Sequence, residues 1–365
     1  MPNYIKRQLF CSCICIGVAS RALACSPTDD AVDVVSDSLP TVIRVVVPHL
    51  DSLGPESINA TFAVSRTGTL AFTRAFDPEN RLVTAIDTSG QVVARFVRRG
   101  QGPGEIAGSS FIGLLDDNVL LALDVSGNRY MAFDARGEPR FTTRPLRTVN
   151  SIPLRFALDS SDVIIIGEAR DLSLSINAIE RVSLATLKAR TLIDARDTSF
   201  RQLGIAYPLA ASRGDIIVLA NSRTYELVEY TAAGAERVKW KRDVPARFRT
   251  AMEVEALLKL QKKLGPDGKL LPKWEGERAR LAGQQTKHIQ TLAFDGRGRL
   301  WAIGEDTTGT AFGDVFADTT YLGRVTIPCK VAKWQISFGG DWMALMCRAP
   351  ETDSGLNLQL FRVGM

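Results

Sequence analysis

The residue types that most often do chemistry in proteins are sparse in this sequence. Its 365 residues include two histidines, His49 and His288, too few for a metal site built from several histidines of one chain. The sequence contains no Gly-x-Ser-x-Gly motif, and a serine triad would need one of those two histidines as its base. Nucleophilic hydrolysis is therefore disfavoured, and each histidine is more simply interpreted as a surface or hydrogen-bonded residue.

A glycine-rich segment, Arg-Gly-Gln-Gly-Pro-Gly-Glu, covers residues 99–105. Backbone N–H groups in such turns can hold a phosphate, but a phosphate-binding loop needs a following helix and a Lys-Ser or Lys-Thr pair, which residues 106–110 lack. We interpret the segment as a structural turn, because glycine adopts backbone angles closed to other residues and proline stiffens the chain. Its residues are Gly100, Gly102, Pro103, Gly104 and Glu105.

The composition is that of a folded globular protein. Apolar residues make up 45% of the sequence, enough to fill the core of one large all-β domain or of two ordinary domains. Lys and Arg total 45 against 40 Asp and Glu, a formal net charge of +5. Because this surplus is spread along the chain without a basic block, the sequence does not indicate nucleic-acid binding.

Residues 1–24 have the features of an export signal peptide. Lys6 and Arg7 precede an apolar run over residues 9–20, which is too short to span a bilayer comfortably. Two interpretations remain open: Ala22-Leu23-Ala24 fits cleavage of a freely secreted protein, and Cys25 fits the lipidated cysteine of a lipoprotein. We expect a periplasmic or cell-surface protein whose membrane contact is limited to an N-terminal anchor at Cys25.

The tether and the cysteines follow from the same export prediction. Residues 25–40 are polar and lack apolar periodicity, so we expect a flexible tether before a folded domain over residues 41–365. Apart from Cys25, the mature chain keeps Cys329 and Cys347. An even pair in an oxidising compartment, with Gly339-Gly340 turning a hairpin between them, predicts a disulfide; two buried free thiols are the alternative.

A strand–turn–strand pattern recurs along the chain. Its clearest copy covers residues 120–137, where two strands are separated by a polar turn and closed by Asp-Ala-Arg-Gly. Strands that end near residues 86, 133, 183, 230, 316 and 361 repeat the pattern at intervals of about 47 residues, with one longer interval. This spacing predicts an all-β chain folded as six blades of a β-propeller.

The last of these units is one strand short. Residues 331–337, 342–346 and 358–362 supply three strands, whereas the β-rich run over residues 41–47 belongs to no unit. We therefore predict that residues 41–47 pair with residues 358–362 as the outer strand of the last blade. This pairing closes the ring and covers an otherwise open edge.

Residues 99–105, followed by Asp124, Asn128, Arg129 and the Phe-Asp-Ala-Arg-Gly of residues 133–137, resemble the NHL repeat and, more closely, bacterial six-bladed propeller lipoproteins with a Gly-x-Gly-Pro-Gly-Glu signature. The best match covers about 40 residues of the chain, and residues 295–301 resemble the entry to a blade's second strand. The resemblance implies that Asp124 and Arg129 pair near the strand ends and support the blade. The third and fourth units lack the Gly-Pro-Gly turn and the Asn-Arg pair.

The longer interval contains residues 245–286, which do not have a strand pattern. Apolar residues at helical spacing predict a helix over residues 247–264, stopped by Gly-Pro-Asp-Gly, and a second short helix over residues 274–281. The segment would join the fourth blade to the fifth on the face where propellers usually hold ligands. Two placements remain open: the helices cap the mouth of the channel, or they lie against the edge of the ring.

The first hypothesis for function is a non-catalytic binding protein, because no catalytic constellation is recognisable. The export signal and the resemblance to NHL-like lipoproteins favour a protein, peptide or glycan ligand at the loop face, with no cofactor. The competing hypothesis is a divalent-metal hydrolase of the lactonase type, with Ca²⁺ held in the central channel by carboxylates and amides from several blades. A structural role in a surface assembly is the third.

Overall fold

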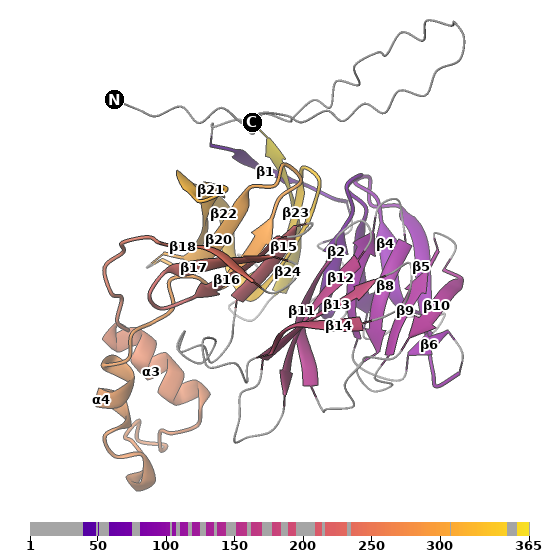
Figure 1. The fold of residues 1–365 in the computed structure, drawn as a ribbon. Helices are drawn as coiled ribbons and strands as arrows, with labels where there is room; N and C mark the ends of the chain where they lie inside the picture. Colours follow the sequence, from indigo (N-terminus) through magenta and orange to yellow (C-terminus); the bar gives the residue numbers. More distant parts are fainter. Residues whose placement is uncertain are drawn as a thin grey trace, which may run out of the picture. The chain divides into compact units, whose positions relative to one another are not determined.

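The computed structural model describes residues 39–48, 50, 58–74, 81–102, 104–106, 110–115, 119–124, 129–134, 137–143, 151–158, 162–169, 177–183, 189–194, 209–213, 216–231, 235–306, 308–348 and 356–364. All of them belong to the unit Val35–Met365. Strands make up most of this part of the chain (Figure 1). The predicted signal peptide, Cys25 and His49 lie outside the described residues.

Four sheets follow one another along the chain. The first contains β2 (Ile58–Val64), β3 (Leu70–Arg74), β4 (Arg81–Ile86), β5 (Val92–Arg99) and β6 (Glu105–Ile106). The second contains β7 (Ser110–Leu115), β8 (Val119–Asp124), β9 (Arg129–Phe133) and β10 (Pro139–Thr143). The third contains β11 (Ser151–Leu158), β12 (Asp162–Ala169), β13 (Asn177–Ser183) and β14 (Ala189–Asp194). The fourth contains β15 (Leu209–Arg213), β16 (Ile216–Asn221), β17 (Glu226–Thr231) and β18 (Glu236–Lys241). Successive strands pair side by side in each sheet, and among the described strands only β5 and β6 pair in parallel.

The remaining strands form one seven-stranded sheet. Its order is β1 (Thr41–Val45), β24 (Leu356–Gly364), β23 (Trp342–Arg348), β22 (Thr320–Gly339), β21 (Thr310–Ala317), β20 (Leu300–Glu305) and β19 (Thr291–Phe294). β22 is 20 residues long and pairs with β21 over its first part and with β23 over its second. One continuous strand therefore serves the last two predicted repeat units.

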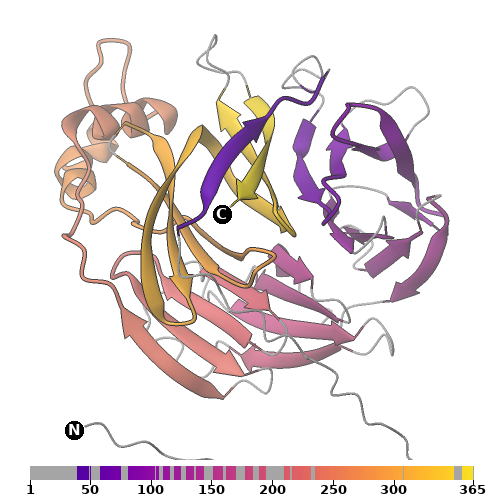
Figure 2. The same ribbon diagram turned by 90° about the horizontal axis from the view of Figure 1, so that it is seen from above.

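The N-terminal strand β1 pairs antiparallel with β24, from Thr41 opposite Gly364 to Val45 opposite Leu360. Figure 2 shows β1 in indigo alongside the yellow strands. Residues 41–47 were predicted to pair with residues 358–362; the two strands do pair, but over residues 41–45 and 360–364. β1 covers an edge of β24 that would otherwise be open, and a strand with an open edge invites association with other chains.

Five turns share one construction. They begin at Ser65, Asp87, Asp134, Asp295 and Asp306, and in each the side-chain oxygen accepts the backbone N–H four residues later, at 2.9 to 3.1 Å. The glycine three residues after each of them has a φ between 77° and 86° and donates its N–H back to the first residue. Such a left-handed position favours glycine over every residue with a Cβ.

Buried apolar side chains fill the space between neighbouring sheets. One cluster joins Phe96 of the first sheet to Leu120 and Phe133 of the second, and another joins Leu227 of the fourth sheet to Ala302. Strands β2, β7, β11, β15 and β19 lie beside one another in that order, and β2 also lies beside β22. The first strand of each sheet thus contacts the first strand of the next.

Between β18 and β19 the chain forms α3 (Ala251–Leu260), a short 3-10 helix η3 (Pro272–Trp274) and α4 (Glu277–Ala282). α3 and α4 lie side by side (Figure 1) and enclose their own small apolar cluster of Val254, Leu258 and Leu281. Thr250 caps α3, with Glu253 completing a capping box.

Two local predictions need correction. The helices predicted over residues 247–264 and 274–281 are Ala251–Leu260 and Glu277–Ala282 instead; the first begins after its cap Thr250 and ends before Lys262, which has a left-handed φ of 52°. The hairpin predicted to turn at Gly339-Gly340 turns one residue later, since Gly339 is still paired with Trp342.

Candidate functional site

The glycine-rich turn and the Asp124–Arg129 pair lie together and hold strands in place. Glu105 accepts the N–H of Gly102 through Oε2 at 2.9 Å, and a Cβ on Gly100 would collide with that carboxylate. Arg129 donates from Nε to Oδ2 of Asp124 at 3.1 Å and also donates to the backbone oxygen of Glu105. This arginine therefore ties the end of the first sheet to the second. Pro103 lies outside the described residues.

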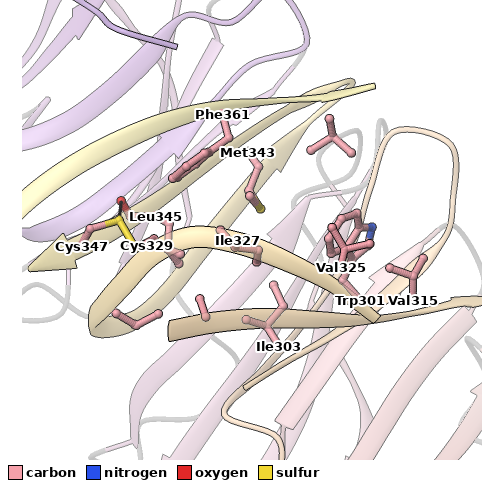
Figure 3. Close-up of a cluster of buried hydrophobic side chains, with 13 residues drawn as sticks. Trp301, Ile303, Val315, Val325, Ile327, Cys329, Met343, Leu345, Cys347 and Phe361 are labelled. Carbon is pink, nitrogen blue, oxygen red and sulfur yellow. Dashed lines mark hydrogen bonds between the residues drawn. A yellow bond between two sulfur atoms is a disulfide. The ribbon is translucent and has the colours of Figure 1, made fainter. Parts of the chain in front are cut away.

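Cys329 and Cys347 are joined by a disulfide with their Cα atoms 5.6 Å apart. Figure 3 shows the bond among buried side chains of the seven-stranded sheet, beside Leu345 and Ile327. Both cysteines are buried, so the bond lies in the core between β22 and β23 and away from any surface at which a ligand could react with it.

One end of the fourth sheet and of β19–β22 brings several loop segments with polar and charged side chains together. We call it the α3 face; it carries residues 222–225, 242–250, 285–290, 305–306 and 308–309. These segments are bound together: the backbone oxygen of Ser222 accepts the N–H of His288 at 2.7 Å, and Gln285 donates from Nε2 to the backbone oxygen of Arg223 at 2.8 Å. At the opposite end lie the β15–β16 and β19–β20 turns, where Arg213 donates to the backbone oxygen of Gly298.

His288 stands at the α3 face, where the chain re-enters the sheet at β19. Its ring lies 6.4 Å from that of Tyr225, and its Nε2 is buried without a hydrogen-bond partner within the described part of the chain. Burial lowers the pKa of His288, and the charges of three arginines lower it further. These are Arg247, Arg324 and Arg242. His288 is therefore a neutral imidazole at pH 7, in a strongly positive surrounding.

Asp314 is the centre of a buried network beside His288. Its side chain is 0% exposed and accepts hydrogen bonds from two arginines. Arg324 donates from Nε to Oδ1 at 2.8 Å and from Nη2 to Oδ2 at 2.9 Å, and Arg242 donates from Nη1 to Oδ2. Two tyrosine hydroxyls complete the network, that of Tyr225 at 2.5 Å from Oδ2 and that of Tyr321 at 3.1 Å from Oδ1.

The network joins four separate segments. Asp314 lies on β21, and Arg324 and Tyr321 lie on β22 beside it. Tyr225 comes from the β16–β17 turn, where its φ is 54°, and Arg242 follows the end of β18 and donates its backbone N–H to the oxygen of Tyr225. Burial and the nearby Asp314 charge raise the pKa of Tyr225, so its hydroxyl stays protonated and donates.

Glu305 lies at the end of β20 on the same face. Burial raises its pKa, whereas the positive charges of Arg247 and Arg348 oppose this rise. Arg247 also pairs with Glu253 at the start of α3. Arg247, whose charge acts on both His288 and Glu305, is thus held in place at the capped start of α3.

Of these groups, the sequence singled out His288 but not the Asp314 network. A signal was present, because Phe312, Asp314 and Phe316 alternate along one strand and therefore share one face. A carboxylate between two phenylalanines on a buried face requires cationic partners. In the part of the chain that the structure describes, no group of three or more His, Cys, Asp or Glu could hold a metal ion. No helix among those residues is both long and apolar enough to cross a membrane.

The comparisons with known proteins concern structure alone. No protein-family model matches the sequence, and no curated protein sequence matches it. A solved member of the DUF4221 family from Bacteroides vulgatus is 12% identical, with a TM-score of 0.51, over 89% of this chain and 96% of that one. The calcium-binding protein regucalcin from Agrobacterium tumefaciens is 13% identical, with a TM-score of 0.49, over 90% of this chain and 96% of that one. The chain has a mostly β, propeller-like fold.

In a propeller the connections at the ends of the sheets are held rigidly by the strands below them, so they are suited to carry recognition residues. The α3 face consists of such connections: the β16–β17 turn, the β20–β21 turn and the segment between β18 and β19. Its described groups can donate hydrogen bonds from guanidinium groups and offer one neutral imidazole. This set is suited to binding an acidic or strongly polar ligand.

Proposed function

We propose that this protein is an exported, non-catalytic binding protein that recognises a protein, peptide or glycan at the α3 face. The observation that carries the proposal is that the charges of Arg242 and Arg247 of this face and of Arg324 on β22 all act on His288. The three arginines act on a single imidazole whose Nε2 lacks a partner among the described residues. A ligand that accepts hydrogen bonds would satisfy the exposed guanidinium donors together.

The proposal includes six blades. Support comes from the third strands of the repeat units, which are β4, β9, β13, β17, β21 and β24, and from the succession of contacts between first strands. β1 would be the outer strand of the sixth blade, as its pairing with β24 supports. In this arrangement the segment of residues 245–286 joins the fourth blade to the fifth at the ligand-binding face.

Export and anchoring remain proposals from the sequence. Residues 1–24 would be removed as a signal peptide, and lipid on Cys25 would hold the propeller near a membrane through the tether of residues 25–40. Only the end of that tether is described, and β1 starts directly after it at Thr41. Metabolic labelling with a radioactive fatty acid tests the anchor: label should enter the wild-type chain and be absent from Cys25→Ser.

Photo-crosslinking in the native cells tests the binding function. A photoreactive amino acid replaces Thr308 at the α3 face or, as the matched control, Thr67 in the β2–β3 turn; both positions are exposed. We expect a discrete adduct from position 308 and none from position 67, because the ligand lies over the α3 face. Adducts from position 67 alone, or from neither position, would contradict the proposal.

Deleting residues 250–281, which leaves Arg247 in place, tests what the helices do. If α3 and α4 rim the site, the shortened protein should fold and lose the adduct at position 308. An unchanged adduct would place the helices against the edge of the propeller instead.

The alternative function, inferred from the sequence, is a divalent-metal hydrolase of the lactonase type that would use Ca²⁺. No group of three or more His, Cys, Asp or Glu among the described residues could hold the ion, and we derive no step through a metal. Elemental analysis of protein purified without chelator, combined with lactone hydrolysis assays, separates the two functions. A stoichiometric divalent ion together with turnover would replace the binding proposal by the hydrolase.

A further inference from the structure

We propose that Arg242 and Arg324 form a built site for an oxyanion, the carboxylate or phosphate group of the ligand. The inference rests on the proposed function, since it names the chemistry by which the α3 face would hold its ligand. It starts from an excess of charge: two guanidinium groups share the single carboxylate of Asp314. One cation would balance that carboxylate, so the cluster carries a surplus of one positive charge.

The second step is that both guanidinium groups are held in place before a ligand arrives. Arg242 lies over the ring of Tyr321 at 4.2 Å and over that of Tyr225 at 5.5 Å, and Arg324 lies over the ring of Phe312 at 3.6 Å. Stacking on a ring and bonding to a buried carboxylate fix the plane of each fork. A fixed fork loses little conformational entropy on binding, which favours affinity.

The third step is that hydrogen-bond donors remain unused. A guanidinium has five N–H groups. Arg324 donates two of them and Arg242 donates one from its side chain, and neither side chain has another hydrogen-bond partner within the described ranges. The side chains are 25% exposed for Arg242 and 43% exposed for Arg324. The remaining donors can therefore reach a group that comes from solvent.

The chemistry of the donors selects the class of ligand. Two adjacent planar forks match the oxygens of a carboxylate, phosphate or sulfate, which accept charge-assisted hydrogen bonds in pairs. One face of each of the rings of Phe312 and Tyr321 is covered by a guanidinium, so the rings orient the arginines. Recognition at this point is therefore by charge and geometry.

The competing explanation is an ion network that only holds the fourth sheet against β21 and β22. Such a network would need Asp314 and one arginine, and its second arginine would gain little at 43% exposure, because exposed ion pairs contribute only about 0–1 kcal/mol. The two explanations differ in one measurable respect. If the network is only structural, added anions cause no saturable shift of the arginine side-chain signals.

The test is an NMR titration of the full chain carrying ¹⁵N-labelled arginine, observed at the side-chain Nε–H signals. Sodium phosphate and sodium acetate are the two probes, each exchanged against sodium chloride at constant ionic strength. The signal of Arg324 is identified by its loss in Arg324→Gln, and that of Arg297 serves as the internal control because Arg297 forms an ordinary ion pair with Asp341. We expect the Arg242 and Arg324 signals to shift and saturate, while that of Arg297 does not saturate.

Arg324→Gln should weaken the apparent affinity, read at Arg242, at least tenfold, whereas Arg297→Gln should leave it unchanged. Saturation with phosphate alone identifies a phosphate-bearing ligand, and saturation with acetate identifies a carboxylate. The proposal is overturned if no signal saturates, or if Arg324→Gln titrates like the wild type. If the NMR signals saturate but photo-crosslinking gives no adduct at position 308, the proposed binding function is wrong and the oxyanion site is still supported.

Discussion

Replacing Asp314 by asparagine is the most informative single change in this protein. Asparagine keeps the size of the side chain and one acceptor oxygen, but it removes the negative charge on which Arg242, Arg324 and two tyrosines converge. The amide also brings an NH₂ group, which can only donate, to the place of one carboxylate oxygen. Two guanidinium groups would then face each other without an anion, and one tyrosine or arginine donor would lose its acceptor.

The size of the effect follows from burial. Removing one partner of a fully buried ion pair destabilises a protein by about 3–5 kcal/mol. Asp314 is 0% exposed, but its arginines are 25% and 43% exposed and keep part of their hydration. We therefore expect Asp314→Asn to lower the free energy of unfolding by about 2–3 kcal/mol, below the range for a wholly buried pair.

Equilibrium urea unfolding of the full chain, followed by tryptophan fluorescence over the reversible range, measures this difference. Asp341→Asn is the matched control, because Asp341 is 45% exposed and pairs with Arg297 at 3.5 Å. Loss of this ion pair should change the free energy of unfolding by less than about 1 kcal/mol. Equal effects of the two substitutions would refute the reasoning, since they would show that burial of Asp314 does not determine what its charge contributes.

Three further predictions concern the turns and the helices. Gly137→Ala should destabilise the protein by about 1–3 kcal/mol in urea unfolding, and by more than Gly268→Ala does. Both glycines have a positive φ, but a Cβ at Gly137 would lie 2.7 Å from the Arg95 oxygen, whereas one at Gly268 meets nothing within 4 Å. Equal losses of stability in the two variants would contradict this. Thr250→Ala removes the cap of α3 and should cost about 1 kcal/mol, seen as faster amide hydrogen exchange in Ala251–Leu260 with the strands unchanged. Hydrogen bonds from Arg280 and Lys263 lower the pKa of Glu277 from 4.5 to about 2. The stability that ionised Glu277 contributes is therefore complete above pH 4.5 and is lost as the pH falls toward about 2. Amide hydrogen exchange in α4 should accelerate over that window, and Glu277→Gln should abolish this pH dependence.

Much of the fold could be predicted because its signals are local. The Asp-Ala-Arg-Gly turn at residues 134–137 contains its own acceptor and its own left-handed glycine, so four neighbouring residues determine the hairpin. β1 and β24 are far apart in sequence, yet their pairing could be predicted by counting strands. The last unit lacked a strand and residues 41–47 lacked a partner, so pairing the two covers the open edge. The end of α3 was misplaced because the helix stops at a left-handed lysine, a conformation with little sequence signature.

The candidate site could be predicted only in part. Position 314 carried a signal, since a carboxylate on the apolar face of a strand needs a cation, but the sequence does not say which one. Arg242 reaches Asp314 across 72 positions and Tyr225 across 89. These pairs form because the fourth sheet packs against β19–β21 through Leu227 and Ala302. Packing of that kind brings ends of strands together without leaving a spacing that a motif could describe.

Binding and stability are coupled at Asp314, because the same carboxylate does two things. It anchors the two arginines against β21, and it partly neutralises the charge that would attract an anion. An anion that binds the outer N–H groups relieves the repulsion between the two guanidinium groups and stabilises only the folded state, so the unfolding midpoint must rise with its concentration. Arg324→Gln removes this rise while Asp314 keeps Arg242 and both tyrosines, so it should lose more in anion binding than in stability. Asp314→Asn has the opposite balance: the charge that attracts the anion grows, but the groups that present it are no longer held.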